Sequence, residues 1–248
     1  MFSKQAASKK IGAREGFRWR GVEISRIEGL SDAVFAFALA LLIVSTEVPK
    51  TYDDLAQKLR DFVPFAACFV QIMAVWYLHY QFYRRYNLQD MRSTVLTMIL
   101  LFVVLFYTYP LKFVYVAWWL SMIAPNEAAK MITSYDQARQ LFSIYAIGYI
   151  AVFCVFGLMY LHAYRSRVLL QLTELEIWDT KHVLREVMLF SGVGVIALTL
   201  ANVLPDEWVY VSGASYSLIG VVSGIHGGWS GRRRMEVHAR LFSTAKSI

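Results

Sequence analysis

Apolar blocks of about 20 residues recur along this chain, and their length constrains its fold more than any other feature. A helix of about 20 residues crosses the roughly 30 Å of hydrocarbon in a bilayer, where backbone groups have no water to bond with. The blocks cover residues 30–46, 62–82, 93–111, 141–164, 187–204 and 208–229. The sequence therefore predicts an all-α membrane protein with six transmembrane helices.

The composition agrees with this fold class. Hydrophobic residues make up 57% of the 248 residues and charged residues only 17%, whereas soluble domains carry about a quarter charged residues. The composition therefore disfavours a soluble enzyme with one buried core.

The distribution of Lys and Arg predicts the orientation of the helices. Nineteen of the 25 basic residues lie in the segments on one side of the predicted membrane, five lie on the other side, and Lys112 lies within an apolar stretch. The positive-inside rule places the richer side in the cytoplasm, together with both termini. We expect a basic cytoplasmic arm over 1–25, a six-helix transmembrane domain over 26–230 and a basic cytoplasmic tail over 231–248.

The net charge of +7 follows from this topology, so it predicts contact with anionic lipids at the cytoplasmic face and no nucleic-acid partner. The first twenty residues are basic and lack the apolar stretch of a cleavable signal peptide.

The sequence lacks the common signatures of catalysis and metal binding. Cys68 and Cys154 each lie alone in an apolar block, which excludes a disulfide framework and predicts two core thiols. The five histidines show no ligand spacing, and the motifs of serine hydrolases, zinc proteases and P-loop proteins are missing. We expect no enzyme activity, no cofactor and no metal site.

Two connections leave their structure open. Residues 113–124 form a second apolar stretch behind Pro110 and Lys112, and they either extend the third helix with a kink or lie in the interface. Lys112 is interpreted as a side chain that snorkels to the outer interface. Residues 165–186, with Glu174, Glu176, Asp179 and Lys181 among apolar residues, predict an amphipathic cytoplasmic helical linker.

Ionisable groups at membrane depth are costly there and normally face a bundle interior or water. They occur at the start of the first predicted helix, as Arg26 and Asp32 with Ser31 between them, and at His79 in the second. The structural alternatives are a charge pair at a helix start and a packed histidine.

One face of the first helix is apolar above this charged start. At about 100° per residue, that face carries Arg26, Leu30, Ala33, Phe37, Ala40 and Val44. Several copies around an axis would place rings of Phe37 and Val44 across a narrow path, which is a known way to gate conduction by dewetting. An ordinary packing seam between helices is the alternative, and periodicity alone does not separate the two.

The first helix also carries a motif: Arg26, three further residues, then Leu30-Ser31-Asp32 and an apolar stretch. This pattern resembles the first-helix signature of the transmembrane protein 175 family of potassium channels, an Arg, three variable residues and Phe-Ser-Asp. Trp76 and His79 resemble the Trp and His that the family carries in its second helix. Span number, length and predicted topology match over nearly the whole chain.

The resemblance implies a bacterial homotetramer, in the inner membrane, whose pore is lined by the four first helices. It implies an apolar constriction at Phe37 and Val44, with Ala40 between them, and no carbonyl selectivity filter. It implies a polar network at the cytoplasmic end, formed by Arg26, Ser31, Asp32, Trp76 and His79. Potassium is the permeant cation that it implies.

Three departures from the family pattern bear on function. Leu30 replaces the motif Phe, Phe37 replaces a usual Ile or Leu, and Ala40 replaces a Thr implicated in selectivity. The leading hypothesis is a potassium-permeable channel of weak selectivity. A non-conducting structural or signalling homologue is the alternative that Phe37 and Ala40 favour, and a secondary transporter is disfavoured by the lack of repeated halves.

Overall fold

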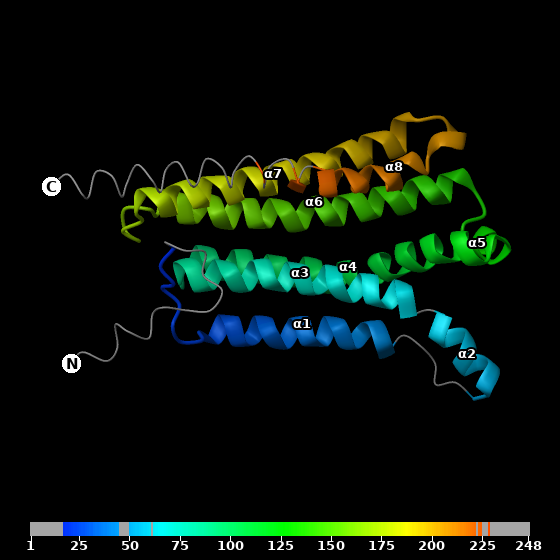
Figure 1. Cartoon of the computed structure of the whole chain (residues 1–248), viewed down its shortest axis with the longest axis horizontal. Coiled ribbons are helices and arrows are strands. Elements are labelled where there is room, and N and C mark those ends of the chain that lie inside the picture. The colour runs from blue at the N-terminus through cyan, green and yellow to red at the C-terminus, as the bar shows by residue number, and fades with distance from the viewer. Residues whose placement is uncertain (1–16, 45–49, 61, 222, 225–227, 229–248) are drawn as a thin grey trace.

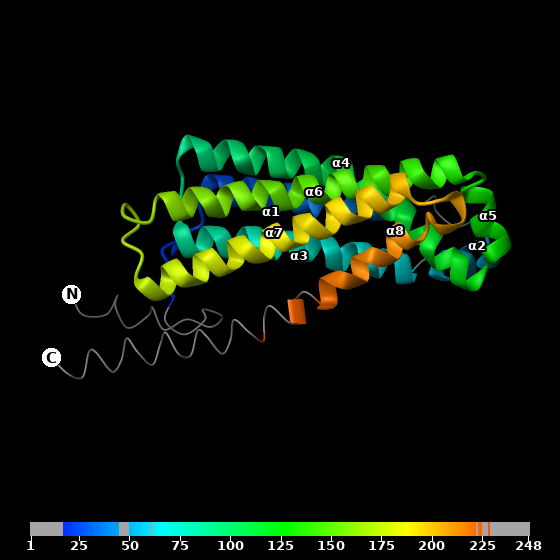
Figure 2. The same ribbon diagram turned by 90° about the horizontal axis from the view of Figure 1, so that it is seen from above.

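The computed structural model describes residues 17–44, 50–60, 62–221, 223–224 and 228. Five helices lie side by side along the long axis, and successive ones run in opposite directions (Figures 1 and 2). They are α1 (Arg26–Val44), α3 (Phe62–Tyr86), α4 (Met91–Ile123), α6 (Tyr135–Arg165) and α7 (Glu174–Val203). The described residues form no strand, so the prediction of an all-α protein is confirmed.

Helices α2 (Tyr52–Arg60) and α5 (Pro125–Met131) connect these helices at one end of the bundle. After α7 the chain continues through the 3₁₀ turn η2 (Asp206–Trp208), α8 (Val211–Ala214) and the 3₁₀ turn η3 (Ser215–Ser217), and both α8 and η3 contact α7. Pro205 and η2 form the tight connection expected between the last two spans. Arg139 of α6 fixes this turn, because its Nη2 lies 2.7 Å from Asp206 Oδ1.

Four of the described helices, α3, α4, α6 and α7, are long and apolar enough to cross a membrane. They contain the second to fifth predicted spans. The first predicted span is α1, which opens with three charged residues in its first seven, and positions 45–46 of that span lie outside the described residues. The sixth begins as η2, α8 and η3, and part of it lies outside the described residues. The predicted count of six therefore stays a prediction for these two spans, and so does the structure of the arm before residue 17 and of the tail 231–248.

The structure decides the two open connections. Helix α4 continues through Pro110 to Ile123, so residues 113–123 extend the third helix instead of lying in the interface. Helix α7 begins at Glu174 with a capping box in which Thr173 and Glu176 bond to each other's backbone. The second half of the predicted linker is therefore the first turns of α7, while residues 166–173 alone form the connection.

The core extends from α1 through α3, α4 and α6 to α7 and is rich in aromatic rings. Phe82, Tyr86 and Tyr160 are fully buried and meet in pairs at 5.2 to 5.8 Å between ring centroids, within the range of favourable aromatic contacts. Gly148 lets α6 approach α4, because a Cβ there would overlap the Tyr107 ring.

Cys68 is buried as predicted, but Cys154 is exposed, so the prediction of two core thiols is wrong for Cys154. The buried residues of α6 lie on the face of that helix opposite to Cys154.

The connection between α3 and α4 is tied to α6. Asp90 caps α4 by accepting from Ser93 N at 3.3 Å, and its Oδ2 lies 2.7 Å from His162 Nε2. Partial desolvation raises the pKa of Asp90, but the hydrogen bonds from Ser93 and the neighbouring His162 outweigh it, so the pKa lies below its ordinary value. The ionised carboxylate is the form that both partners stabilise.

Residues 17–25 form a strap that crosses the end of the bundle before α1 begins. Its backbone N–H groups at Arg20 and Gly21 donate to the Arg84 carbonyl at 3.0 and 3.2 Å. Arg18 and Arg20 form ion pairs at 3.3 and 2.8 Å with the buried carboxylate of Glu176 in α7. The strap therefore joins the starts of α1 and α7 to the end of α3.

A buried ion pair completes this junction. Arg84 Nη2 lies 2.8 Å from Glu28 Oε1, and Arg84 Nη1 donates to the Gly21 carbonyl at 2.8 Å. Ser25 donates through both its N–H and its hydroxyl to the other oxygen of Glu28. Both charges are buried, so their hydrogen bonds must replace the water that each has lost.

We expect Glu28→Ala to lower the free energy of unfolding by about 3 to 5 kcal/mol, because Arg84 would stay buried without its carboxylate. Glu23→Ala removes an exposed carboxylate of the same strap and should change stability by less than about 0.5 kcal/mol. Unfolding of both variants in one detergent measures the difference. Equal losses would contradict the anchoring role of the pair.

Candidate functional site

Helix α1 has two faces of different character. The face that packs on α3 and α4 is buried and consists of Glu28, Ser31, Phe35, Ala38 and Leu42. These positions are spaced by three or four residues, so they form one stripe along the helix. This stripe fixes the rotation of α1 and therefore decides which side chains face away from the bundle.

The opposite face is apolar and exposed. Leu30 is 49% and Phe37 57% exposed, and Ala33 and Ala40 are also exposed. An apolar face of this extent on a single chain is available to contact another chain, lipid or a conduction path. Four of the six residues that periodicity assigned to one apolar face thus lie on it in the structure, and the side chain of Val44 lies outside the described residues.

The start of this face holds a hydrogen-bonded pair between α1 and α3. Trp76 Nε1 donates to Asp32 Oδ1 at 2.7 Å. The Trp76 ring stacks on Tyr80 at 5.6 Å between centroids, and Trp19 of the strap meets Tyr80 edge-on at 6.3 Å. The stacked rings hold the indole in place, so the carboxylate of Asp32 has a fixed position at the rim of the exposed face.

His79 serves a different contact. It is only 2% exposed, and its Nε2 lies 3.4 Å from Thr97 Oγ1 of α4. Its ring lies 4.9 Å from that of Tyr83, whose hydroxyl also bonds to Thr97 at 2.9 Å. His79 therefore joins α3 to α4 behind α1.

The five polar residues predicted as one network are thus divided within a single chain. Asp32 and Trp76 form a pair, while Ser31 donates to the Ile27 carbonyl of its own helix at 2.7 Å. Arg26 is exposed at the start of α1, and among the described residues no hydrogen bond joins it to Asp32, Trp76 or His79. A role for Arg26 requires a partner beyond these contacts.

Two contacts of α1 were not predicted from the sequence. The Glu28–Arg84 pair fixes one end, and at the other end Lys112 Nζ of α4 donates to the Leu42 carbonyl at 2.8 Å. A cation at the C-terminal end of a helix interacts favourably with the helix dipole. Lys112 thus bonds to the end of α1, and the interpretation that it snorkels to the outer interface stays a prediction. Its position inside an apolar stretch was the signal that it needed a partner.

The arrangement around α1 offers ion pairs, the exposed apolar face of α1 and the carboxylate of Asp32 at the rim of that face. Among the described residues, no three His, Cys, Asp or Glu side chains gather to hold a metal ion. The exposed apolar face of α1 can contact another helix or lipid, and the Asp32 carboxylate can interact with a cation.

Sequence comparisons identify relatives of this arrangement. The family model described as endosomal/lysosomal potassium channel TMEM175 matches residues 26–110, from α1 into α4. A protein of Marivirga tractuosa named potassium channel is 40% identical over 206 residues, which cover 80% of this chain and 82% of that protein.

Solved structures share the fold. A variant of the potassium channel MtTMEM175, crystallised with a nanobody–MBP fusion protein, matches with a TM-score of 0.77 at 36% identity over 90% of this chain and 100% of that chain. A lysosomal potassium-selective channel TMEM175 homolog from Chamaesiphon minutus matches with a TM-score of 0.56 over 81% of this chain and 96% of that one. At 22% identity, the second match indicates the fold alone.

We expect Asp32→Ala to lower the stability of the folded protein by about 1 to 3 kcal/mol, because it leaves the Trp76 indole N–H without its acceptor. Asp32→Asn keeps an acceptor at the same place and is the matched control. Thermal unfolding and size-exclusion profiles of both variants measure the loss. If Asp32→Ala kept its stability and assembly but abolished ion flux, Asp32 would be a conduction residue and not a structural one.

Proposed function

The chain belongs to the TMEM175 family of potassium channels, and from that premise we propose that four copies form a potassium-permeable cation channel around their α1 helices. The resemblance seen in the Arg26 and Leu30-Ser31-Asp32 motif is confirmed at the level of the family. The family consists of channels, so the chain is not an enzyme.

The exposed apolar face of α1 is the observation that carries this proposal. In lipid, hydrophobicity does not itself drive helices together, so association depends on close packing and polar contacts. Ala33 and Ala40 leave room between the larger Leu30 and Phe37 on this face. Four such faces around an axis would enclose a path whose width alternates with side-chain size.

The proposed constriction lies at Phe37, Ala40 and Val44. At a rise of 1.5 Å per residue, Phe37 lies about 7 Å along the helix from Asp32, and Val44 about 10 Å beyond Phe37. Apolar rings at these levels oppose the passage of hydrated ions and gate by dewetting. The sequence has no Thr-Val-Gly-Tyr-Gly filter and no hydroxyl at Ala40, so the proposal includes weak selectivity between potassium and sodium.

The packing of α1 supports this role. The Glu28–Arg84 pair holds one end of α1 and the Lys112–Leu42 contact holds the other. A helix fixed at both ends presents its exposed face at a defined rotation, which a narrow constriction requires.

The charges of the bundle support the proposed orientation. The end at which α1 begins, α3 ends and α7 begins carries Arg18, Arg20, Arg84, Arg85 and Arg167 (Figure 1). We propose that this end faces the cytoplasm and its anionic lipids, with the chain in a bacterial inner membrane, as the Marivirga relative suggests.

The first prediction from this proposal concerns assembly. In mild detergent the protein should have a mass of about 114 kDa without the detergent, four times the 28.5 kDa of one chain, because a closed ring of like subunits covers the exposed faces. Light scattering coupled to size exclusion measures this mass. A folded monomer as the sole species would contradict a pore made from several α1 helices.

The second prediction concerns the constriction. Phe37→Ala should raise the flux of potassium and of sodium by about tenfold, the rate equivalent of a barrier lowered by about 1.4 kcal/mol, because truncation widens and wets the narrowest ring. Flux into liposomes under each gradient is the measurement. Phe106→Ala, a change at a 71% exposed Phe of α4, is the matched control and should leave flux unchanged.

A second variant separates width from selectivity. Ala40→Thr should raise the ratio of potassium to sodium flux, because it adds hydroxyl ligands near the path without widening the Phe37 ring.

The non-conducting alternative gives a different result: if the α1 face is only a packing seam, Phe37→Ala loses about 3 to 5 kcal/mol of stability and gains no flux. That outcome would remove the gate and favour the structural homologue that Phe37 and Ala40 suggest.

A further inference from the structure

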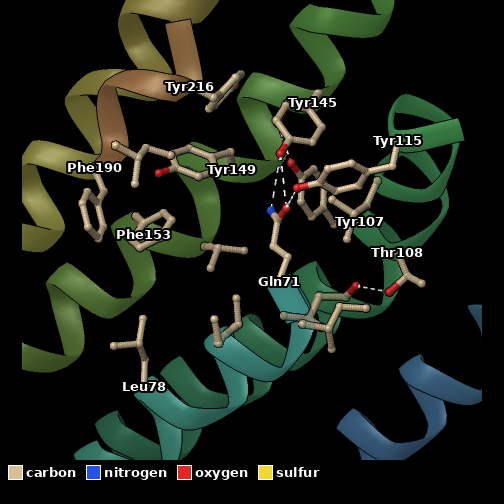
Figure 3. Close-up of a pocket in the computed structure, with 17 residues that line it drawn as sticks. Gln71, Leu78, Tyr107, Thr108, Tyr115, Tyr145, Tyr149, Phe153, Phe190 and Tyr216 are labelled. Atoms are coloured by element: carbon tan, nitrogen blue, oxygen red, sulfur yellow. Dashed lines mark hydrogen bonds between the residues drawn. The ribbon is translucent and has the colours of Figure 1, made fainter. Parts of the chain in front are cut away.

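A cavity of about 430 Å³ lies inside the bundle, away from α1. Its walls are the middle turns of α3, α4 and α6, together with Phe190 of α7 and residues 216 and 219 that follow α8 (Figure 3). This volume lies within the range of about 300 to 1,000 Å³ that small-molecule sites occupy.

The lining of this cavity carries no charged side chain. It consists of aliphatic and aromatic residues with five tyrosines, Gln71 and Thr108 as the polar groups. A charged ligand at this depth would lose its hydration and meet no opposite charge. The lining therefore selects a neutral molecule that is mainly apolar.

The polar groups at one end of the cavity bond to one another. Tyr115 donates to Gln71 Oε1 at 2.6 Å, and Gln71 Nε2 donates to the Tyr145 hydroxyl at 3.4 Å. Tyr107 donates to the Tyr145 carbonyl at 3.1 Å. Figure 3 shows these three rings gathered around Gln71. This end of the cavity needs no ligand to satisfy its hydrogen bonds.

Two further tyrosines of the lining differ. The hydroxyls of Tyr149 and Tyr216 are buried, and in the described part of the chain neither has a hydrogen-bond partner. Their rings meet at 5.1 Å between centroids, so the two hydroxyl-bearing side chains belong to one wall. Tyr149 is only 5% exposed. Buried hydroxyls are nearly always paired, so two unpaired ones lining one cavity indicate a missing partner.

Water alone does not suit this wall. An ordered internal water typically makes about three hydrogen bonds, whereas the Tyr149 ring lies 4.7 Å from that of Phe153 between centroids, and the apolar Phe190 and Ile219 line the same cavity. A molecule with an apolar body and one hydrogen-bonding group would fill the apolar volume and pair with a hydroxyl at once.

We propose that this cavity binds a neutral amphiphile, an apolar body with a single hydroxyl-type group directed at Tyr149 and Tyr216. Ala74 in the lining is exposed, and Phe190, Tyr216 and Ile219 are only partly buried, so the cavity reaches the surface of the single chain, at the depth of the predicted hydrocarbon core. The ligand therefore enters from the bilayer. The proposal does not depend on conduction, so it stands or fails separately from the proposed pore.

Two probes of equal size test the hydroxyl requirement. Para-phenylphenol carries one hydroxyl, and para-methylbiphenyl replaces that hydroxyl with a methyl group. Each is titrated by calorimetry into the full chain in lipid nanodiscs, and titration into empty nanodiscs corrects for partition into lipid. We expect para-phenylphenol to bind about tenfold more tightly, as one added hydrogen bond of about 1.4 kcal/mol would give.

Variants locate the binding. Tyr149→Phe combined with Tyr216→Phe should abolish the preference for para-phenylphenol, whereas Tyr160→Phe should keep it, because the unpaired Tyr160 hydroxyl is buried outside this cavity. Val152→Phe should fill the cavity and weaken both probes at least tenfold. Val195→Phe, at a half-exposed position of α7 outside the lining, should weaken neither.

Thermal unfolding without probe verifies that each variant is folded. Equal affinity of the two probes would overturn the proposal in favour of a cavity that takes hydrocarbon alone, such as a lipid chain. Binding that survives Val152→Phe, or a hydroxyl preference that survives the double tyrosine variant, would place the site elsewhere and also overturn it.

Discussion

The ion pair between Arg84 and Glu28 fixes the position of α1, on which the candidate pore face depends. Charges this deeply buried are stable only when hydrogen bonds replace their lost hydration. Gly21 accepts from the Arg84 guanidinium and Ser25 donates to Glu28, so the strap supplies those bonds. One arginine at the end of α3 thereby sets where the chain crosses the bundle end and where α1 starts.

The sequence predicted the positions of α3, α4 and α6 well because the length and apolar character of such helices are set by the bilayer. It placed the start of α7 thirteen residues late, since Glu174 and Glu176 suggested a separate cytoplasmic helical linker. That interpretation missed the two arginines of the strap, which neutralise Glu176 from more than 150 positions away. Charge alone therefore could not mark the helix boundary: the partner lies in a distant segment.

For the candidate site too, one part could be predicted from the sequence and another could not. The grouping of Leu30, Phe37 and Ala40 on one apolar face follows from helical period, whereas their exposure in a single chain does not, because a buried packing seam has the same period. Pairings between helices do not follow from period: Asp32 meets Trp76, but His79 meets Thr97. The family resemblance assigned these polar residues to one network, whereas within one chain they bond to different partners.

The contact of Lys112 with the end of α1 has a mechanical consequence. With Glu28 held at one end and the Leu42 carbonyl at the other, α1 cannot slide or rotate against α4 without breaking a charged hydrogen bond. If α1 lines the proposed pore, the smallest change that alters its width within one subunit is a rotation of the Phe37 ring about its own side-chain torsions, because that ring is exposed. Opening the proposed pore by backbone movement would instead require α1, α3 and α4 to move together as one rigid unit.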